Sequence, residues 1–207
     1  LNGLMLHGGV RVFGGTFFVF SDYLKAALRL SALQNLPVTY VFTHDSIAVG
    51  EDGPTHEPIE HLASLRTIPN TYVFRPAQAA WYLSQKVNNK PTSLVLTRQN
   101  LPVLENTSFE KVSKGAYVVY ETSSDFDTIL IATGSEVALA VDAARELEKE
   151  GSKVRVVSMP SVELFEEQSK EYKEELLPRS VRRRVSLEMG NTALWYKYVG
   201  LDGLAIG

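Results

Sequence analysis

The stretch that decides the fold is VTYVFTHDSIAVGEDGPTH, residues 38–56. Its first five residues are all β-branched or aromatic, which predicts a strand over 38–42. The residues that follow are polar, hold two of the chain's four histidines, and are interrupted by Gly50, Gly53 and Pro54. A buried strand that ends in such a loop is where α/β proteins place ligand-binding residues. We therefore expect this loop to lie at the functional edge of a parallel sheet.

Strand and helix patterns alternate on both sides of this stretch. The polar, irregular segment 100–113 interrupts the alternation, which then restarts, so it is a candidate linker. The fold class predicted is α/β, with two tandem three-layer α/β/α domains and mostly parallel sheets, over residues 1–108 and 109–207. The expected strands are 16–20, 38–42, 71–74, 93–97, 115–120, 127–132, 154–157 and 184–187. The main expected helices are one capped by Ser21 or Asp22 that runs to about Leu33, one over 58–66, one over 77–87, and one that follows Glu136 and stops at Gly151.

Composition excludes several classes of function. The chain has 207 residues, 44% of them hydrophobic, with a net charge of −3 and no cysteine. The net negative charge does not favour binding to nucleic acid. The absence of cysteine excludes disulfides and thiolate metal sites. No apolar run is long enough to span a membrane. The first residues lack an initiator Met and resemble no signal peptide, and the last ones stop on a predicted strand, so we expect a fragment at both ends.

Four polar side chains are candidates for a substrate site. His44 and Arg98 follow the strands predicted at 38–42 and 93–97, and Asp52 and His56 lie in the loop that His44 opens. Histidine exchanges protons near neutral pH, arginine can hold a phosphate in a bidentate manner, and a carboxylate accepts hydrogen bonds from hydroxyls. This set would suit a phosphorylated polyol. The alternative is that His44 is a packed residue at a strand end and the loop is a solvated turn.

Two further features each have two interpretations. Phe17, Phe20 and Tyr23 recur at a spacing of three, so they either form an aromatic wall for a flat ring or are ordinary core. Gly134 lies between a predicted strand and a predicted helix, where it either helps to hold an anion at the helix N-terminus or forms a tight turn.

Several motifs along the chain resemble those of the transketolase family. The signature is THDS (43–46) joined to GEDGPTH (50–56), and the match extends over essentially the whole chain. The resemblance implies a thiamine-diphosphate-binding-like pyrimidine domain followed by a transketolase C-terminal-domain-like fold. The other matching motifs, in order, are Asn2-Gly3, LHGG (6–9), Thr16-Phe17, Phe20, Tyr23, Arg75-Pro76, RQNL (98–101), IATGSE (131–136) and WYKYVG (195–200).

This resemblance also implies roles for the candidate residues. Phe20, with Phe17 and Tyr23, would bind the aminopyrimidine ring of thiamine diphosphate. The implied substrate-binding residues are His44, Asp52, His56 and Arg98, of which His44 and His56 would also be catalytic. The reaction would be transfer of a two-carbon ketol unit from a ketose phosphate to an aldose phosphate, as in the pentose phosphate pathway. No catalytic residue is expected in the second domain, and no metal ligand in this chain.

The same resemblance implies that parts of the site lie outside the chain. The family's catalytic glutamate would precede Leu1, and the ligands of the diphosphate and of a magnesium or calcium ion would belong to a missing N-terminal domain. The family builds its site across a homodimer interface in the cytoplasm. We therefore expect the 207-residue chain to be inactive on its own, with sugar phosphates rather than nucleic acid or membrane as partners.

Three other functions are considered. A β-like subunit of a 2-oxo-acid dehydrogenase combines the same two domain types, but it has no use for a phosphate-holding Arg98. A dihydroxyacetone synthase is a closer variant that the motifs do not separate from a transketolase. The non-enzymatic alternative is a cofactor-free assembly module.

Overall fold

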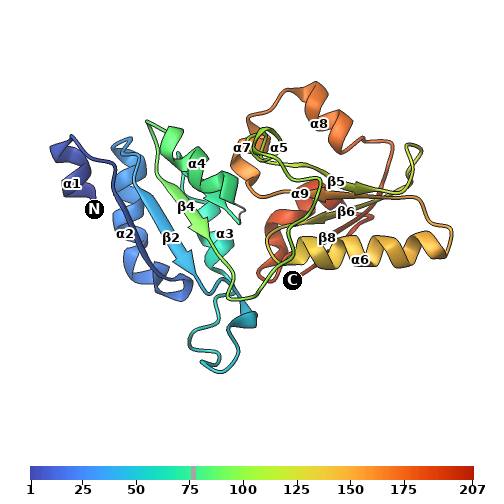
Figure 1. The fold of residues 1–207 in the computed structure, drawn as a ribbon, viewed down its shortest axis with the longest axis horizontal. Coiled ribbons are helices and arrows are strands. Elements are labelled where there is room, and N and C mark those ends of the chain that lie inside the picture. Colours follow the sequence, from blue (N-terminus) through green and yellow to red (C-terminus); the bar gives the residue numbers. More distant parts are fainter. Residues whose placement is uncertain (76–77) are drawn as a thin grey trace. The chain divides into compact units, whose positions relative to one another are not determined.

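The computed structural model describes residues 1–75 and 78–207, without the side chain of residue 78. It divides into two compact units, Leu1–Gln99 and Asn100–Gly207 (Figure 1). Each unit has one sheet with helices around it. The first sheet is entirely parallel, and in the second only the edge strand β5 is antiparallel. The prediction of an α/β fold with mostly parallel sheets is confirmed.

The first unit has the strand order β1-β2-β4-β3. After β2 the chain passes over one strand position to form β3, and β4 then pairs between β2 and β3. Its strands are β1 (Phe13–Phe17), β2 (Thr39–Thr43), β3 (Tyr72–Phe74) and β4 (Thr92–Val95), and its helices are α1 (Asn2–His7), α2 (Ser21–Leu33), α3 (His61–Arg66) and α4 (Gln78–Lys86), with short 3-10 turns η1 (Phe18–Phe20) and η2 (Ile47–Val49).

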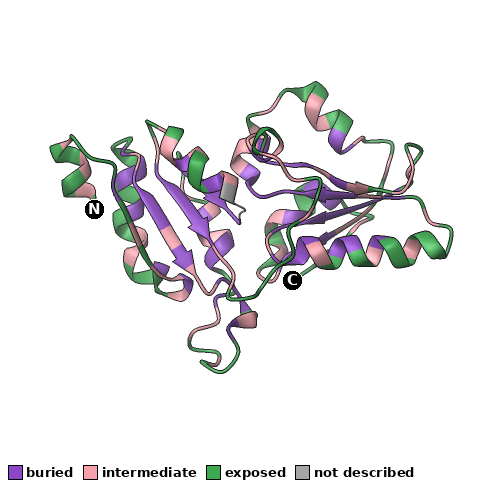
Figure 2. Cartoon of the chain, in the orientation of Figure 1, coloured by how far each residue is buried: buried purple, intermediate pink, exposed green. Residues whose placement is uncertain are grey.

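Helices cover both faces of this first sheet. On one face, Leu28 of α2 and Leu65 of α3 pack with Tyr40 and Phe42 of β2 in one buried cluster. On the other face, Trp81 of α4 contacts Phe13 edge to face, with 5.2 Å between ring centroids. Since successive side chains of a strand point to opposite faces, these contacts place α4 opposite α2 and α3. Figure 2 shows the buried strands between the helices.

The second unit has the strand order β5-β7-β6-β8-β9 and is also three layers deep. On one face, Ile131 and Val157 pack with Phe165 and Trp195, and helix α6 covers the other face with Val137 and Ala144. Its strands are β5 (Tyr117–Glu121), β6 (Thr128–Ala132), β7 (Val154–Ser158), β8 (Arg183–Leu187) and β9 (Leu204–Ile206), and its helices are α5 (Phe109–Val112), α6 (Glu136–Lys149), α7 (Val162–Glu166), α8 (Lys170–Leu176) and α9 (Tyr196–Val199), with η3 (Thr192–Trp195).

The first strand differs from the prediction. A strand was expected over 16–20, but β1 spans Phe13–Phe17 and residues 18–20 form a 3-10 turn. Gly14 and Gly15 lie inside the strand, although glycine usually interrupts one. Close neighbours explain Gly15, because a Cβ there would come within 3.1 Å of the Val41 carbonyl oxygen on the adjacent strand.

Buried hydroxyls join the N-terminal helix to this unit. The Tyr40 hydroxyl donates to Asn2 Oδ1 at 3.0 Å and lies 2.7 Å from Ser31 Oγ of α2. Burial raises the pKa of the Tyr40 hydroxyl, so it remains a neutral donor at all ordinary pH values. Among the described residues, no helix is both long enough and apolar enough to cross a membrane.

Gly115, just before β5, offers a test of the second unit's packing. Its φ is +81°, and a Cβ there would lie 2.6 Å from the Ser161 carbonyl oxygen and even closer to the Phe165 amide nitrogen. We expect Gly115→Ala to lower the free energy of unfolding by about 3 kcal/mol or more, from overpacking and backbone strain together. The matched control is Gly151→Ala, which has a φ of +86° but open space around the added methyl, and should cost only about 1 kcal/mol. Urea unfolding followed by tryptophan fluorescence in a Trp81→Phe background, where only Trp195 emits, measures both, and equal losses would contradict the packing argument.

Candidate active site

Parallel pairing brings the predicted polar residues to one edge of the first sheet. Phe17, the last residue of β1, is in register with Thr43, the last residue of β2. His44 follows directly, and Arg98 comes three residues after the end of the neighbouring strand β4. The carboxyl edge of an open parallel sheet is the usual position of a ligand site, so the strand exits of this unit are the candidate site.

Five rings form a connected group at this edge, which we call the ring cluster: Phe17, Phe20, Tyr23, His44 and His56. The His44 imidazole stacks on Phe17, with 3.8 Å between centroids and 23° between planes. Phe17 stacks on Phe20 at 6.4 Å, and Phe20 meets Tyr23 at 6.1 Å and His56 at 5.6 Å, the last edge to face. The structure thus connects two predicted substrate residues to the three aromatic residues at a spacing of three.

Exposure separates these aromatic rings from the core. Phe20 is 37% exposed and Tyr23 is 87% exposed, whereas Phe18, which lies between Phe17 and Phe20 in the sequence, is fully buried. The interpretation of Phe20 and Tyr23 as ordinary core is therefore wrong, and Phe18 is the core residue of this segment. Apolar rings left open to solvent beside imidazoles fit a flat aromatic ligand, because such a ligand would cover surface that the unit itself leaves exposed.

The polar candidates keep groups available for a ligand. His44 Nδ1 lies 3.0 Å from Thr43 Oγ1 and His56 Nδ1 lies 2.9 Å from Thr55 Oγ1, while neither Nε2 has a hydrogen-bond partner among the described residues. The side chains of Asp52 and Arg98 are exposed, and within the described ranges neither makes a hydrogen bond or an ion pair. Among the described residues, no hydrogen bond, ion pair or ring contact joins these last two side chains to the ring cluster, so these interactions group the two histidines but not the acid and the arginine.

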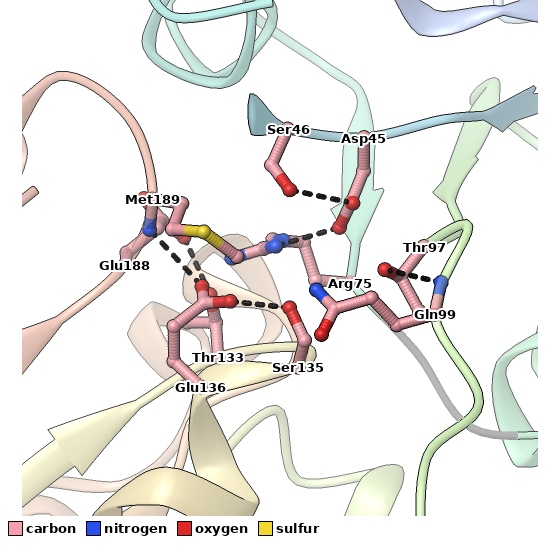
Figure 3. Close-up of polar contacts among 10 residues, drawn as sticks. All are labelled: Asp45, Ser46, Arg75, Thr97, Gln99, Thr133, Ser135, Glu136, Glu188 and Met189. Atoms are coloured by element: carbon pink, nitrogen blue, oxygen red, sulfur yellow. Dashed lines mark hydrogen bonds and ion pairs between the residues drawn. The ribbon is translucent and has the colours of Figure 1, made fainter. Parts of the chain in front are cut away.

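A buried ion pair behind this edge was missed by the sequence analysis. Arg75 Nη2 donates to Asp45 Oδ2 at 2.6 Å, and the two side chains are 0% and 2% exposed (Figure 3). Ser46 Oγ donates to the other carboxylate oxygen, Oδ1, at 3.1 Å. Asp45 and Arg75 both lie in motifs that carried the family resemblance. The sequence offered no signal that Asp45 and Arg75 would meet, since 30 residues separate them.

The equivalent edge of the second unit is occupied by its own carboxylates. Glu188, after β8, accepts hydrogen bonds from Thr133 Oγ1 at 2.6 Å and from Trp195 Nε1 at 3.0 Å. Glu136, the first residue of α6, accepts from the Met189 amide at 3.0 Å and from Ser135 (Figure 3).

This arrangement decides the role of the turn at Gly134. Two buried carboxylates lie beside the N-terminus of α6, and an acid there already complements the helix dipole. A further anion would be repelled, which argues against an anion site. Gly134 has a φ of 55°, so the glycine serves the tight turn.

The tertiary structure also brings together three possible metal ligands, Asp22, Glu60 and His61. His61 Nε2 lies 3.2 Å from Asp22 Oδ2, and His61 Nδ1 lies 3.9 Å from Glu60 Oε2. Asp22 also pairs with Lys25 at 3.6 Å. These contacts join α2 to α3, and they connect residues too far apart in sequence to suggest a metal motif.

Two family models together match nearly the whole chain. Residues 1–103 match the model described as transketolase, pyrimidine binding domain, and residues 115–207 match the transketolase-like C-terminal domain. The probable transketolase of Streptococcus pneumoniae is 70% identical over 212 residues, which cover 100% of this chain and 32% of that protein. The chain thus spans about a third of the length of such relatives.

Solved structures agree with this assignment. Transketolase of Pichia stipitis in complex with sedoheptulose-7-phosphate is 47% identical, with a TM-score of 0.88 over 94% of this chain and 29% of that chain. An inactive β4 tetramer of a split-gene transketolase is 27% identical, with a TM-score of 0.75 over 99% of this chain and 68% of that one. On the evidence of both domain models and these similarities, the chain belongs to the transketolase family, whose members depend on thiamine diphosphate.

Proposed function

We propose that this chain supplies the pyrimidine-binding and C-terminal domains, residues 1–108 and 109–207, of a transketolase. That enzyme transfers a two-carbon ketol unit from a ketose phosphate to an aldose phosphate. The observation that carries the proposal is the exposed ring cluster, in which His44 and His56 contact the aromatic rings directly. A site of this kind places proton-exchanging groups beside a flat ligand, as a reaction on a ring-bound substrate requires.

The aromatic side chains are the proposed holders of the cofactor. Phe20, with Phe17 and Tyr23 beside it, offers an open apolar surface for the aminopyrimidine of thiamine diphosphate. When bound, thiamine diphosphate supplies the nucleophilic carbon and the electron sink that ketol transfer needs. The chain's part is to hold the ring by stacking and to exclude water from one side of it.

The polar side chains are the proposed holders of the sugar phosphate. The Nε2 atoms of His44 and His56 have no protein partner in the described part of the chain, so each is available to bind a substrate hydroxyl and exchange its proton. Asp52 would accept hydrogen bonds from hydroxyls, and Arg98 would hold the phosphate by bidentate hydrogen bonds. An exposed guanidinium with no ion-pair partner among the described residues favours a phosphosugar over the short oxo acid of a dehydrogenase.

The remaining parts of the enzyme are proposed to lie outside this chain. They are a catalytic glutamate, a domain that binds the diphosphate with magnesium or calcium, and a second subunit in a cytoplasmic homodimer of the pentose phosphate pathway. Support comes from the chain's extent, about a third of its curated relatives. The split-gene relative is a second support, because its chain, of which this chain covers 68%, forms an inactive tetramer.

The 207-residue chain alone should therefore show no ketol transfer. A coupled assay with a ketose phosphate donor, an aldose phosphate acceptor, thiamine diphosphate and magnesium measures this, and the longer protein proposed to contain the chain is the positive control. Turnover by the 207-residue chain would show that the missing parts are dispensable and would contradict this arrangement of the site.

In the longer protein, His44→Ala should lower kcat/KM by about 10²–10⁴-fold, the range for loss of a proton-transferring side chain. Circular dichroism and the unfolding midpoint should change little, because the His44 side chain is only half-buried. His7→Ala is the matched control, since His7 lies exposed on α1 and contacts none of the ring cluster. Activity that survives in His44→Ala would return His44 to the role of a packed strand-end residue.

Replacing Arg98 separates binding of the phosphate from binding of the sugar. Arg98→Ala should raise KM for a ketose phosphate by about ten- to a hundredfold, the value of a hydrogen bond to a charged group. KM for the corresponding unphosphorylated ketose should stay nearly the same. Arg145→Ala, at an exposed arginine of α6, is the control for loss of one positive charge. An equal rise in KM for both substrates would exclude Arg98 as the phosphate ligand.

A further inference from the structure

The buried pair Asp45–Arg75 joins two strands that are not neighbours. Asp45 lies two residues after β2, and Arg75 directly follows β3. Strand β4 lies between β2 and β3, so the ion pair reaches across the carboxyl end of β4. A contact of this kind sets the position of the loop that leaves β2 relative to the whole sheet, rather than relative to one adjacent strand.

A buried ion pair is a costly way to stabilise a fold. Removing two charges from water is expensive, and well-packed apolar residues would often do as well. Here both oxygens of the carboxylate are bonded, Oδ2 by Arg75 and Oδ1 by Ser46, and both partners hold it in one orientation. Because hydrogen bonds are directional, these two bonds fix the orientation of the Asp45 carboxylate more strictly than apolar packing would.

The residue whose geometry needs specifying is His44. Its φ is 61°, in the left-handed region that non-glycine residues avoid. Such a conformation persists only where the surroundings impose it. The turn at His44 lets the Asp45 carboxylate be buried while the His44 imidazole stacks on Phe17 at 3.8 Å between centroids.

We propose that Asp45 and Arg75 are positioning residues that hold the His44 imidazole against Phe17. The catalytic consequence rests on the function proposed above, whereas the structural claim stands without it. With the ion pair in place, the backbone after β2 cannot relax out of the left-handed conformation without unburying a charged group. His44 is thereby oriented before any ligand binds, which reduces the cost of ordering it during the reaction.

The first test is spectroscopic and uses the 207-residue chain. The protons of the His44 ring should resonate upfield, because the ring lies over the face of Phe17. With labelled histidine, the four ring signals are assigned by single substitutions, and Phe17→Leu marks the position of the His44 signal without ring stacking. In Asp45→Asn, which removes the charge and keeps the shape, the His44 signal should lose most of its upfield displacement and move to the Phe17→Leu position.

Leu28→Ala is the matched control for a loss of stability alone. Leu28 is fully buried in the same unit, on α2, and its truncation should leave the His44 signal in place. A folded Asp45→Asn variant with an unmoved His44 signal would overturn the proposal, and so would an equal movement in Leu28→Ala. If Asp45→Asn does not fold, the double variant Asp45→Asn with Arg75→Met decides by the same two criteria, because it removes the ion pair without leaving a buried charge unpaired.

The second test measures ketol transfer in the longer protein. Asp45→Asn should lower kcat/KM by about 100-fold, as expected when a catalytic group is displaced by about 1 Å. Leu28→Ala should change it little once both variants are compared as folded protein. Absence of ketol transfer in the unsubstituted protein would refute the proposed function, but it would leave the spectroscopic result, and the positioning role, to stand or fall separately.

Discussion

The candidate site depends on the parallel register of β1 and β2. That register sets Phe17 opposite Thr43, so the two strands end at the same level. His44, the next residue, then stacks on Phe17, and the chain leaving β1 brings Phe20 into contact with Phe17 and Tyr23 into contact with Phe20. A shift of one residue in either strand would turn these side chains to the opposite face, because side-chain direction alternates along a strand. Without this pairing the ring cluster would not form.

Several features of the first unit that reduce stability lie at the carboxyl edge of its sheet. Phe20 and Tyr23 expose apolar rings, His44 adopts a left-handed conformation, and the Asp45–Arg75 pair is fully desolvated. Strain and unfavourable burial concentrated at one place are typical of a functional site, where the rest of the fold supplies the stability that the site uses. In the second unit the corresponding edge carries buried carboxylates instead of exposed rings, and Glu188 and Glu136 bond to nearby hydroxyl, indole and amide groups.

The sequence predicted the elements well because they depend on local patterns. The strand at 38–42 was found within one residue as β2, and the helix expected from a cap at Ser21 or Asp22 to about Leu33 was found as α2, which begins at Ser21. Strand β1 was misplaced, because Gly14 and Gly15 normally interrupt a strand. Only the proximity of a neighbouring backbone, which the local pattern does not encode, explains Gly15 within it.

The sequence by itself determined the strand–helix alternation, the polar loop after β2 and the identity of the candidate residues His44, Asp52, His56 and Arg98. It left open whether Phe20 and Tyr23 were core, because a spacing of three residues occurs for buried and for exposed side chains alike. Tertiary structure decided that question, and it alone brought Asp45 to Arg75 and Glu188 to Thr133. The physical reason is range: propensity and periodicity act over a few residues, whereas burial and ion pairing depend on which distant segments the sheet order places side by side.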